Sequence, residues 1–203
     1  MKVSLFSLFM AASTIVFTAC GNENNAPAAG TTTAENSNAS TVDGQASPGA
    51  SSGSTTVAAT PVQDVVEHYL HIKNALANDN GAEAANGAQA MVASLEKINP
   101  ATFTDEQQKL YNDVAEDLKE HAEHTADNAG KIDHQREHFV MMSANVQELI
   151  QTFGAHKTLY LDHCPMANND KGANWISETE EISNPYMGKK MPKCGSMEKV
   201  IKP

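Results

Sequence analysis

Apolar residues recur every three to four positions along four successive stretches of the chain, which is the spacing of one buried face of an α-helix. Short segments containing Gly or Pro separate the stretches, so the predicted helices follow one another closely. Short connections favour antiparallel neighbours, and the sequence therefore predicts an all-α fold with an antiparallel four-helix bundle over residues 61–154. The stripes are Val62, Val65, Val66, Tyr69, Ile72 and Leu76; Ala84, Ala88, Met91, Val92, Leu95 and Ile98; Leu110, Val114, Leu118, Ala122 and Thr125; and Phe139, Met142, Val146, Leu149, Ile150 and Phe153.

Capping residues indicate where these helices begin and end. Thr60 and Thr104 each stand three positions before a glutamine, which is the capping-box pattern of a helix start. Asp133 is the capping type of residue that precedes the fourth stripe, and Gly154 follows its last apolar residue. We therefore expect the first helix to start after Thr60 and the fourth to end at Gly154.

The hydrophobic pattern changes after the fourth helix. Residues 158–161 alternate like a short strand, and the rest is too rich in Pro and Gly for a long helix. This segment nevertheless contains the single tryptophan, Trp175, and an aromatic Tyr186. We expect residues 155–203 to form a loop-rich cap with at most short strands, packed on the bundle so that 61–203 fold as one domain.

The first twenty residues have the pattern of an export signal. Lys2 precedes an apolar run from Val3 to Phe17, which is too short for a stable membrane span. The small pair Thr18-Ala19 stands directly before Cys20, as lipoprotein processing requires. We predict that residues 1–19 are a lipoprotein signal peptide and that Cys20 carries the lipid. The mature protein would be anchored to a bacterial envelope membrane and face the periplasm, with the outer surface or plain secretion as alternatives.

Residues 20–60 contain almost no large apolar side chain and consist mainly of Asn, Ala, Thr, Ser and Gly. Such a segment cannot bury enough surface to offset its ordering entropy, so we predict a flexible tether between the lipid and the folded domain. The chain has 25 acidic and 14 basic residues, a formal net charge of -11. This charge disfavours nucleic acid and anionic lipid as partners and is compatible with a metal ion or a basic partner.

Soft metal ligands gather around two cysteines in the C-terminal cap. Thiolate and thioether sulfur favour Cu(I), and methionine keeps its affinity where thiols tend to be oxidised. Two Cys/Met clusters in one short, polar segment are hard to explain as core residues, so the pattern predicts a Cu(I) or Ag(I) site. The candidate ligands are Cys164, Met166, Cys194 and Met191, with His163 and Met197 as alternates and Met187 nearby.

The same two cysteines admit a different interpretation. In an oxidising compartment two remaining thiols usually pair. A Cys164–Cys194 disulfide would close a loop of about 30 residues and contribute about 3 to 4 kcal/mol by the chain-entropy argument. A structural zinc site is less favoured, because the sequence lacks four Cys and His residues at zinc-finger spacings. The metal site and the disulfide both remain open at this point.

Six of the eight histidines stand in pairs three or four residues apart, a spacing that brings both members to one side of a helix. Two of these pairs border the turn between the third and fourth helices, where antiparallel packing places them at similar heights. The pair in the first helix, His68 and His71, lies off the apolar stripe and is predicted to face solvent. A second, weaker site for Cu(II) or Zn(II) is predicted from His121, His124, His138 and Met142, with His134 expected further out and hydrogen bonding at the bundle boundary as the alternative.

Sequence motifs of common enzyme and cofactor sites are missing from the chain. There is no Gly-rich phosphate loop, no Cys-x-x-Cys-His haem attachment and no His-Glu-x-x-His zinc-protease motif. We therefore expect no enzymatic activity and no organic cofactor.

Several motifs give the chain a family resemblance. "CPMA", "GANWIS", "EISNPYMG" and "MPKCG" follow one another at the C-terminal end, after "HAEH" at 121–124 and "HQREHF" at 134–139. With these motifs, residues 62–202 resemble an uncharacterised bacterial exported-domain family that occurs as stand-alone lipoproteins and fused to periplasmic adaptor subunits of copper/silver-type efflux pumps. Met187 departs from the pattern, which has an aromatic residue there. The resemblance implies a copper-handling context and an efflux adaptor or another envelope protein as a partner, without a known activity.

Two functions are consistent with these patterns. The leading hypothesis is a membrane-anchored periplasmic protein that binds Cu(I) or Ag(I) and passes the ion to efflux partners by ligand exchange. The rival is an interaction module whose cap is held by a Cys164–Cys194 disulfide and docks on an efflux adaptor or another envelope protein, without tight metal binding.

Overall fold

The structure contains the four helices that the apolar stripes predict. A computed structural model of the protein describes residues 59–203, so the predicted signal peptide, the predicted lipidation site Cys20 and nearly all of the predicted tether lie outside the described residues. The helices are α1 (Gln63–Ala77), α2 (Gly81–Leu95), α3 (Asp105–Asp127) and α4 (Ile132–Phe153). Each packs against the next, and α4 also contacts α1. Within the described part of the chain, no helix is both long enough and apolar enough to cross a membrane.

Two of the predicted helix ends are confirmed. The Thr104 side chain accepts a hydrogen bond from the backbone N–H of Gln107 at 3.3 Å, and the Gln107 side chain accepts one from the backbone N–H of Thr104 at 3.1 Å. This reciprocal pair satisfies two N–H groups that the start of α3 would otherwise leave free. Gly154 ends α4 with a φ of 82°, a conformation that glycine adopts without steric cost.

Two other predicted caps are wrong. The N-cap of α1 is Val62 and makes no side-chain cap, so Thr60 stands two positions too early and contributes only its carbonyl, which accepts from the N–H of Gln63 at 3.0 Å. The N-cap of α4 is Lys131, and Asp133 lies inside the first turn instead. A carboxylate in that position still interacts favourably with the positive end of the helix dipole.

A three-stranded antiparallel sheet follows the helices, where the sequence predicts a loop-rich cap with at most short strands. β1 (Leu159–Cys164) is the central strand, flanked by β2 (Ala173–Ser177) and β3 (Ser196–Ile201). The fold is therefore helix-rich with a small sheet, and the predicted all-α class is too narrow.

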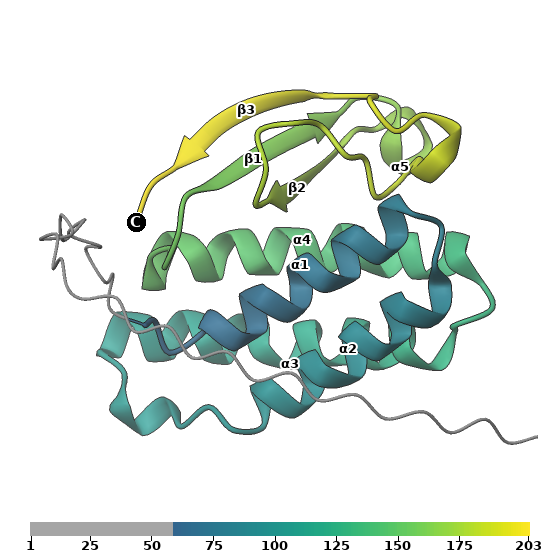
Figure 1. The fold of residues 1–203 in the computed structure, drawn as a ribbon. Coiled ribbons are helices and arrows are strands. Elements are labelled where there is room, and N and C mark those ends of the chain that lie inside the picture. The colour runs from purple at the N-terminus through teal and green to yellow at the C-terminus, as the bar shows by residue number, and fades with distance from the viewer. Residues whose placement is uncertain (1–58) are drawn as a thin grey trace, which may run out of the picture. The chain divides into compact units, whose positions relative to one another are not determined.

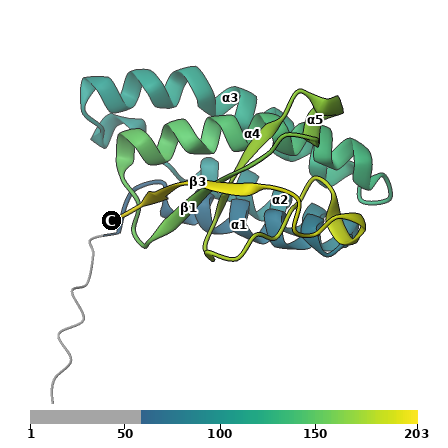
Figure 2. The ribbon, with the colours of Figure 1, turned by 90° about the horizontal axis from the view of Figure 1, so that it is seen from above.

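The sheet covers one side of the helices. Figure 1 shows it against α1 and α4, with α2 and α3 on the far side of that pair, and Figure 2 shows the strands lying over α1 and α4 from above. Three short helical turns complete the fold: η1 (Pro100–Thr102), α5 (Ala167–Asp170) and η2 (Gly188–Lys190).

The core lies between the helices and beneath the sheet. Tyr69, Leu118 and Phe139 of the predicted stripes are fully buried, and Trp175 of β2 is fully buried with them. Tyr186, in the loop after β2, has an exposed fraction of only 8 %. The C-terminal segment thus contributes its largest side chains to the same core as the helices.

A buried hydroxyl network joins the helices to the sheet. Tyr69 Oη of α1 lies 2.8 Å from Ser143 Oγ of α4 and accepts a hydrogen bond from the N–H of Ile176 in β2 at 3.1 Å. The hydroxyl of Tyr186 lies 3.1 Å from the same Ser143 Oγ and donates to the carbonyl of Asn174. Three hydroxyl groups therefore fix α1, α4, β2 and the following loop relative to one another.

A fully buried carboxylate, Asp162, lies on the face of the sheet that packs against the helices. Asp162 of β1 pairs in register with Trp175, and neither of its side-chain oxygens has a hydrogen-bond partner. Burial raises the pKa of Asp162 to about 6, although the ammonium group of Lys73 acts in the opposite direction. The fold therefore favours the protonated, uncharged form of this group.

Asp162→Asn is expected to stabilise the protein at neutral pH. Because the pKa in the folded state lies above the usual value of about 3.9, the stability from this group is present below about pH 4 and is lost as the pH rises through about 6. The neutral amide removes that loss, which is on the order of 3 kcal/mol. Urea unfolding of the wild type and the variant at pH 7.5 and pH 4.5 would measure the gain in the free energy of unfolding. An equal gain at both pH values would contradict a raised pKa of Asp162.

Candidate metal centre

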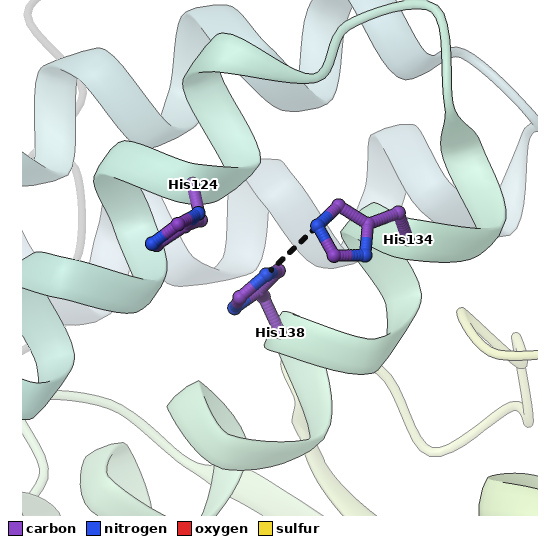
Figure 3. Close-up of side chains that lie close together, drawn as sticks. All are labelled: His124, His134 and His138. Carbon is purple, nitrogen blue, oxygen red and sulfur yellow. Dashed lines mark hydrogen bonds between the residues drawn. The ribbon is translucent and has the colours of Figure 1, made fainter. Parts of the chain in front are cut away.

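Four histidines meet where α3 and α4 are joined. His121 and His124 belong to the end of α3, and His134 and His138 belong to the beginning of α4. The connecting turn is closed by a hydrogen bond from the N–H of Lys131 to the carbonyl of Asn128 at 2.9 Å. Figure 3 shows His124 reaching from α3 toward His134 and His138 of α4. The tight turn thus brings both histidine pairs to one place, which we call the imidazole cluster.

His138 is the centre of the imidazole cluster. Its Nδ1 lies 3.1 Å from His121 Nδ1, and its Nε2 lies 3.2 Å from His134 Nε2. The His124 ring stacks on it, with ring centroids 4.7 Å apart and an angle of 6° between the planes. Each nitrogen of His138 therefore faces the nitrogen of another imidazole.

The surroundings keep His138 uncharged. Burial lowers the pKa of His138, and the neighbouring imidazoles lower it further because each is positive when protonated. Only the carboxylate of Glu137 opposes them. A neutral imidazole keeps a free nitrogen lone pair, which is the form that binds a metal ion.

Three of the four histidines have the spacing of a metal site. One ring nitrogen from each of His124, His134 and His138 lies within 4.8 Å of the others. Zinc–nitrogen bonds of about 2.0–2.1 Å place tetrahedral ligand atoms roughly 3.4 Å apart. Small side-chain rotations would therefore bring the three nitrogens onto one ion. His124 is exposed, while His134 and His138 are partly buried, so the group can be reached from solvent.

Carboxylates surround the imidazole cluster. Glu137 Oε2 lies 2.9 Å from His134 Nδ1, which leaves Nε2 of that ring facing His138. Glu120 lies 3.8 Å from His124 Nε2. Carboxylates of this kind orient metal-binding imidazoles, and a negative helix attracts cations. Along α3 the acidic residues are Asp105, Glu106, Asp113, Glu116, Asp117, Glu120, Glu123 and Asp127, against the basic Lys109 and Lys119.

The structure changes the predicted histidine site in two ways. It brings together His121, His124 and His138 as expected from the turn, but His134 joins them because it lies one turn before His138 on the same side of α4. Met142 was wrongly included, since its side chain is fully buried on the core side of α4. The spacing of four between His134 and His138 was the signal that could have found the missing member.

The two cysteines lie side by side without a bond. Their sulfur atoms are 2.9 Å apart, with Cys164 buried and Cys194 partly exposed. A disulfide requires about 2.05 Å, whereas two thiolates that share an ion with bonds of about 2.3 Å lie roughly 3.8 Å apart. The contact with Cys164 and burial raise the pKa of the Cys194 thiol, and the backbone N–H of Met166 lowers it. The pair is thus placed for either predicted outcome after a movement of the order of 1 Å.

The other residues predicted to bind metal with the cysteines do not all lie beside them. His163 precedes Cys164 in β1, and successive strand residues point to opposite faces. The His163 ring instead contacts Asn174 at 2.6 Å, so the prediction that His163 joins the cysteines is wrong. Met166 and Met191 contact Cys194 through backbone atoms, and Met197 is exposed on β3.

Comparison with known proteins gives one match. Residues 65–158 match the sequence model of a family described as "Protein of unknown function (DUF3347)". The matched segment covers less than half of the chain and includes the whole imidazole cluster, while both cysteines of the folded domain lie beyond it. No curated protein and no solved structure matches the chain.

His138 is expected to titrate at a lower pH than an isolated histidine, whose pKa is about 6.5. Because His134 contributes to this lowering, His134→Gln should raise the pKa of His138, whereas His71→Gln on α1 should leave it unchanged. The measurement is an NMR titration of the ring Cε1–H resonances of metal-free protein. An unchanged His138 midpoint in the His134 variant would show that the rings are not coupled.

Proposed function

We propose that the protein is an exported metal-binding protein that holds Cu(II) or Zn(II) at the imidazole cluster. The observation that carries the proposal is the mutual approach of nitrogens from His124, His134 and His138 within 4.8 Å. Imidazole nitrogen is a common ligand of Zn(II) and Cu(II), which are neither strongly hard nor strongly soft ions, so the ligand type supports these two metals. His121 is a fourth imidazole at the edge of the group, 3.1 Å from His138.

The same geometry supports reversible binding. Three protein ligands leave at least one coordination position open, and the exposed His124 forms the solvent side of the group. An ion held in this way can exchange ligands with a partner one at a time. We therefore treat the metal as cargo that is taken up and released, and we propose no catalysed reaction.

The proposed setting comes from the sequence. The signal pattern and Cys20 support a lipid anchor in the bacterial envelope, and we infer that α1 to α4 form an antiparallel bundle carried on the tether. The resemblance of the C-terminal motifs to domains fused to copper/silver efflux adaptors supports such an adaptor, or another envelope protein, as the receiver of the metal. Copper is accordingly the cargo that we favour.

The cysteine pair supports a second candidate function. The predicted Cu(I) or Ag(I) ligand set of Cys164, Met166, Cys194 and Met191 keeps its two thiols adjacent. The sulfur separation of 2.9 Å lies about midway between the length of a disulfide and the roughly 3.8 Å between two thiolates on one ion, so the same pair is also placed for a disulfide. In an oxidising compartment the pair would then act as a staple, and the segment after β1 would serve as a docking surface for an envelope partner.

Removing one imidazole from the imidazole cluster should weaken metal binding. We expect His138→Ala and His134→Ala each to weaken Zn(II) and Cu(II) binding by at least about tenfold, because each removes a direct ligand. His68→Ala on α1 is the matched control and should bind as the wild type does. Competition titrations of purified protein against a chromophoric chelator provide the measurement.

The protein would not be a metal-binding protein of this kind if the wild type failed to compete with a chelator of micromolar affinity. An equal loss of metal affinity in His68→Ala would likewise count against the imidazole cluster, because the effect would then not be specific to its histidines. Circular dichroism of each variant confirms that α3 and α4 remain helical.

Counting thiols separates the two roles of the cysteines. If Cys164 and Cys194 form the staple, protein isolated from the periplasm without reductant should show no reactive thiol after unfolding and two after reduction. Cys164→Ser combined with Cys194→Ser should then lower the free energy of unfolding by about 3 to 4 kcal/mol. Two reactive thiols in the unreduced protein, together with loss of Cu(I) binding in the double variant, would favour the metal-ligand role.

A further inference from the structure

A cavity of about 300 Å³ opens between the beginning of α4 and the loops that follow β1 and β2. Met166, Ala167 and Asp170 come from the segment after β1, and Tyr186 and Met187 come from the loop after β2. The opposite wall belongs to α4 and includes Glu137 and Val140. We call this the thioether cavity, because the fold brings two methionines that lie far apart in the sequence to its wall.

Met166 is left exposed by the core, and Met187 lies at its edge. Met166 has an exposed fraction of 45 %, one of four large apolar side chains left exposed in residues 59–203. Met187 is partly buried and packs at the edge of the core cluster. Exposed thioethers that line a cavity are available to a ligand, whereas a fully buried side chain such as Met142 is not.

A strained turn forms the rim of the thioether cavity. Asn168, Asn169 and Asp170 follow one another with φ values of 53°, 56° and 62°, all in the left-handed region. Each such residue costs about 1–2 kcal/mol, and Asn and Asp are the non-glycine types that tolerate it best. Strain of this kind persists where the surrounding structure holds it, and it concentrates at ligand sites.

The charges on the wall favour a cation. The guanidinium of Arg136 also borders the cavity, but it is occupied elsewhere: its Nη2 contacts Asp79 at 2.5 Å and its Nε donates to the carbonyl of Pro185 at 2.9 Å. The carboxylates of Glu137 and Asp170 remain on the wall. Glu137 also contacts His134 Nδ1 at 2.9 Å, so the cavity and the imidazole cluster share a side chain.

We propose that the thioether cavity binds a soft monovalent ion, Cu(I) or Ag(I), through the sulfur atoms of Met166 and Met187, with the charge balanced by Glu137. Thioether sulfur selects such ions over Zn(II) and over hard cations. This Cu(I) or Ag(I) site rests on the proposed function, because it also treats a metal ion as cargo. It adds a binding site with thioether ligands beside the imidazole cluster. Methionines cannot form a disulfide, so this site persists when Cys164 and Cys194 are oxidised.

The test uses Ag(I), which undergoes no redox change, and protein labelled with ¹³C at the methionine methyl groups. The expected result is that the methyl resonances of Met166 and Met187 move together at the first equivalent of Ag(I). Met141 is the internal control, because it is similarly exposed, at 52 %, but lies outside the cavity. Met166→Leu and Met187→Leu should each weaken Ag(I) binding by about tenfold or more, and Met141→Leu should not.

Several results would overturn the assignment. One is movement of all exposed methionine resonances in parallel, and another is unaltered affinity in both cavity variants. A third is loss of the Met166 and Met187 shifts in Cys164→Ser, Cys194→Ser protein, since the ion would then sit on the thiols. Met166 is exposed and leucine is similar in volume, so the variants should fold, which circular dichroism checks.

A histidine variant separates this inference from the proposed function. In His138→Ala protein the Ag(I) shifts of Met166 and Met187 should remain while Zn(II) binding is lost. If wild-type protein binds Ag(I) at these methionines but never binds Zn(II) or Cu(II), the imidazole proposal fails and the thioether cavity stands. If Zn(II) binds and Ag(I) moves neither methyl group, only the thioether cavity is wrong.

Discussion

The hydroxyl network of Tyr69, Ser143 and Tyr186 is the contact on which the arrangement of sheet and helices depends. A single buried hydrogen bond contributes only about 1 kcal/mol net, but a buried hydroxyl left without its partner costs about 1–3 kcal/mol. Moving the sheet away from α1 and α4 would separate Tyr69 from the N–H of Ile176 and Tyr186 from Ser143, and would leave these groups unpaired. Because Tyr186 directly precedes Met187 and lines the thioether cavity itself, the network that fixes the core also positions that cavity.

Helix α4 connects the core with both candidate sites. Phe139 and Ser143 face the core, where Ser143 belongs to the hydroxyl network. His134 and His138 lie on the side of α4 that faces α3. Glu137 lies between these directions and touches both the imidazole cluster and the cavity. A helix turns about 100° per residue, so neighbouring positions serve different surfaces. Because Glu137 contacts His134 and also lines the cavity, an ion bound at either candidate site would change the electrostatic environment of the other.

Helices and their stripes follow from local patterns, which is why the sequence predicts them well and even gives the capping box at Thr104. Sheet pairing does not: Tyr160 pairs with both Ser177 and Val200, and no short-range pattern encodes such distant partners. The same limit explains the ligand predictions. His163 adjoins Cys164 in sequence but points to the other face of a strand. The spacing of four between His134 and His138 indicates that both lie on one side of α4, but it does not show that α3 packs against that side.

The three kinds of candidate ligand respond differently to the conditions outside a cell. Thiols are lost as ligands when they form a disulfide, and the 2.9 Å contact of Cys164 with Cys194 makes that loss structurally easy. Imidazoles survive oxidation but are protonated in acid, although the lowered pKa of His138 extends its range. Thioethers have no proton to gain near neutral pH and form no disulfide. Met166 and Met187 in one cavity, beside the imidazole cluster, would thus keep a binding site for a soft ion such as Cu(I) or Ag(I) when acid protonates the imidazoles.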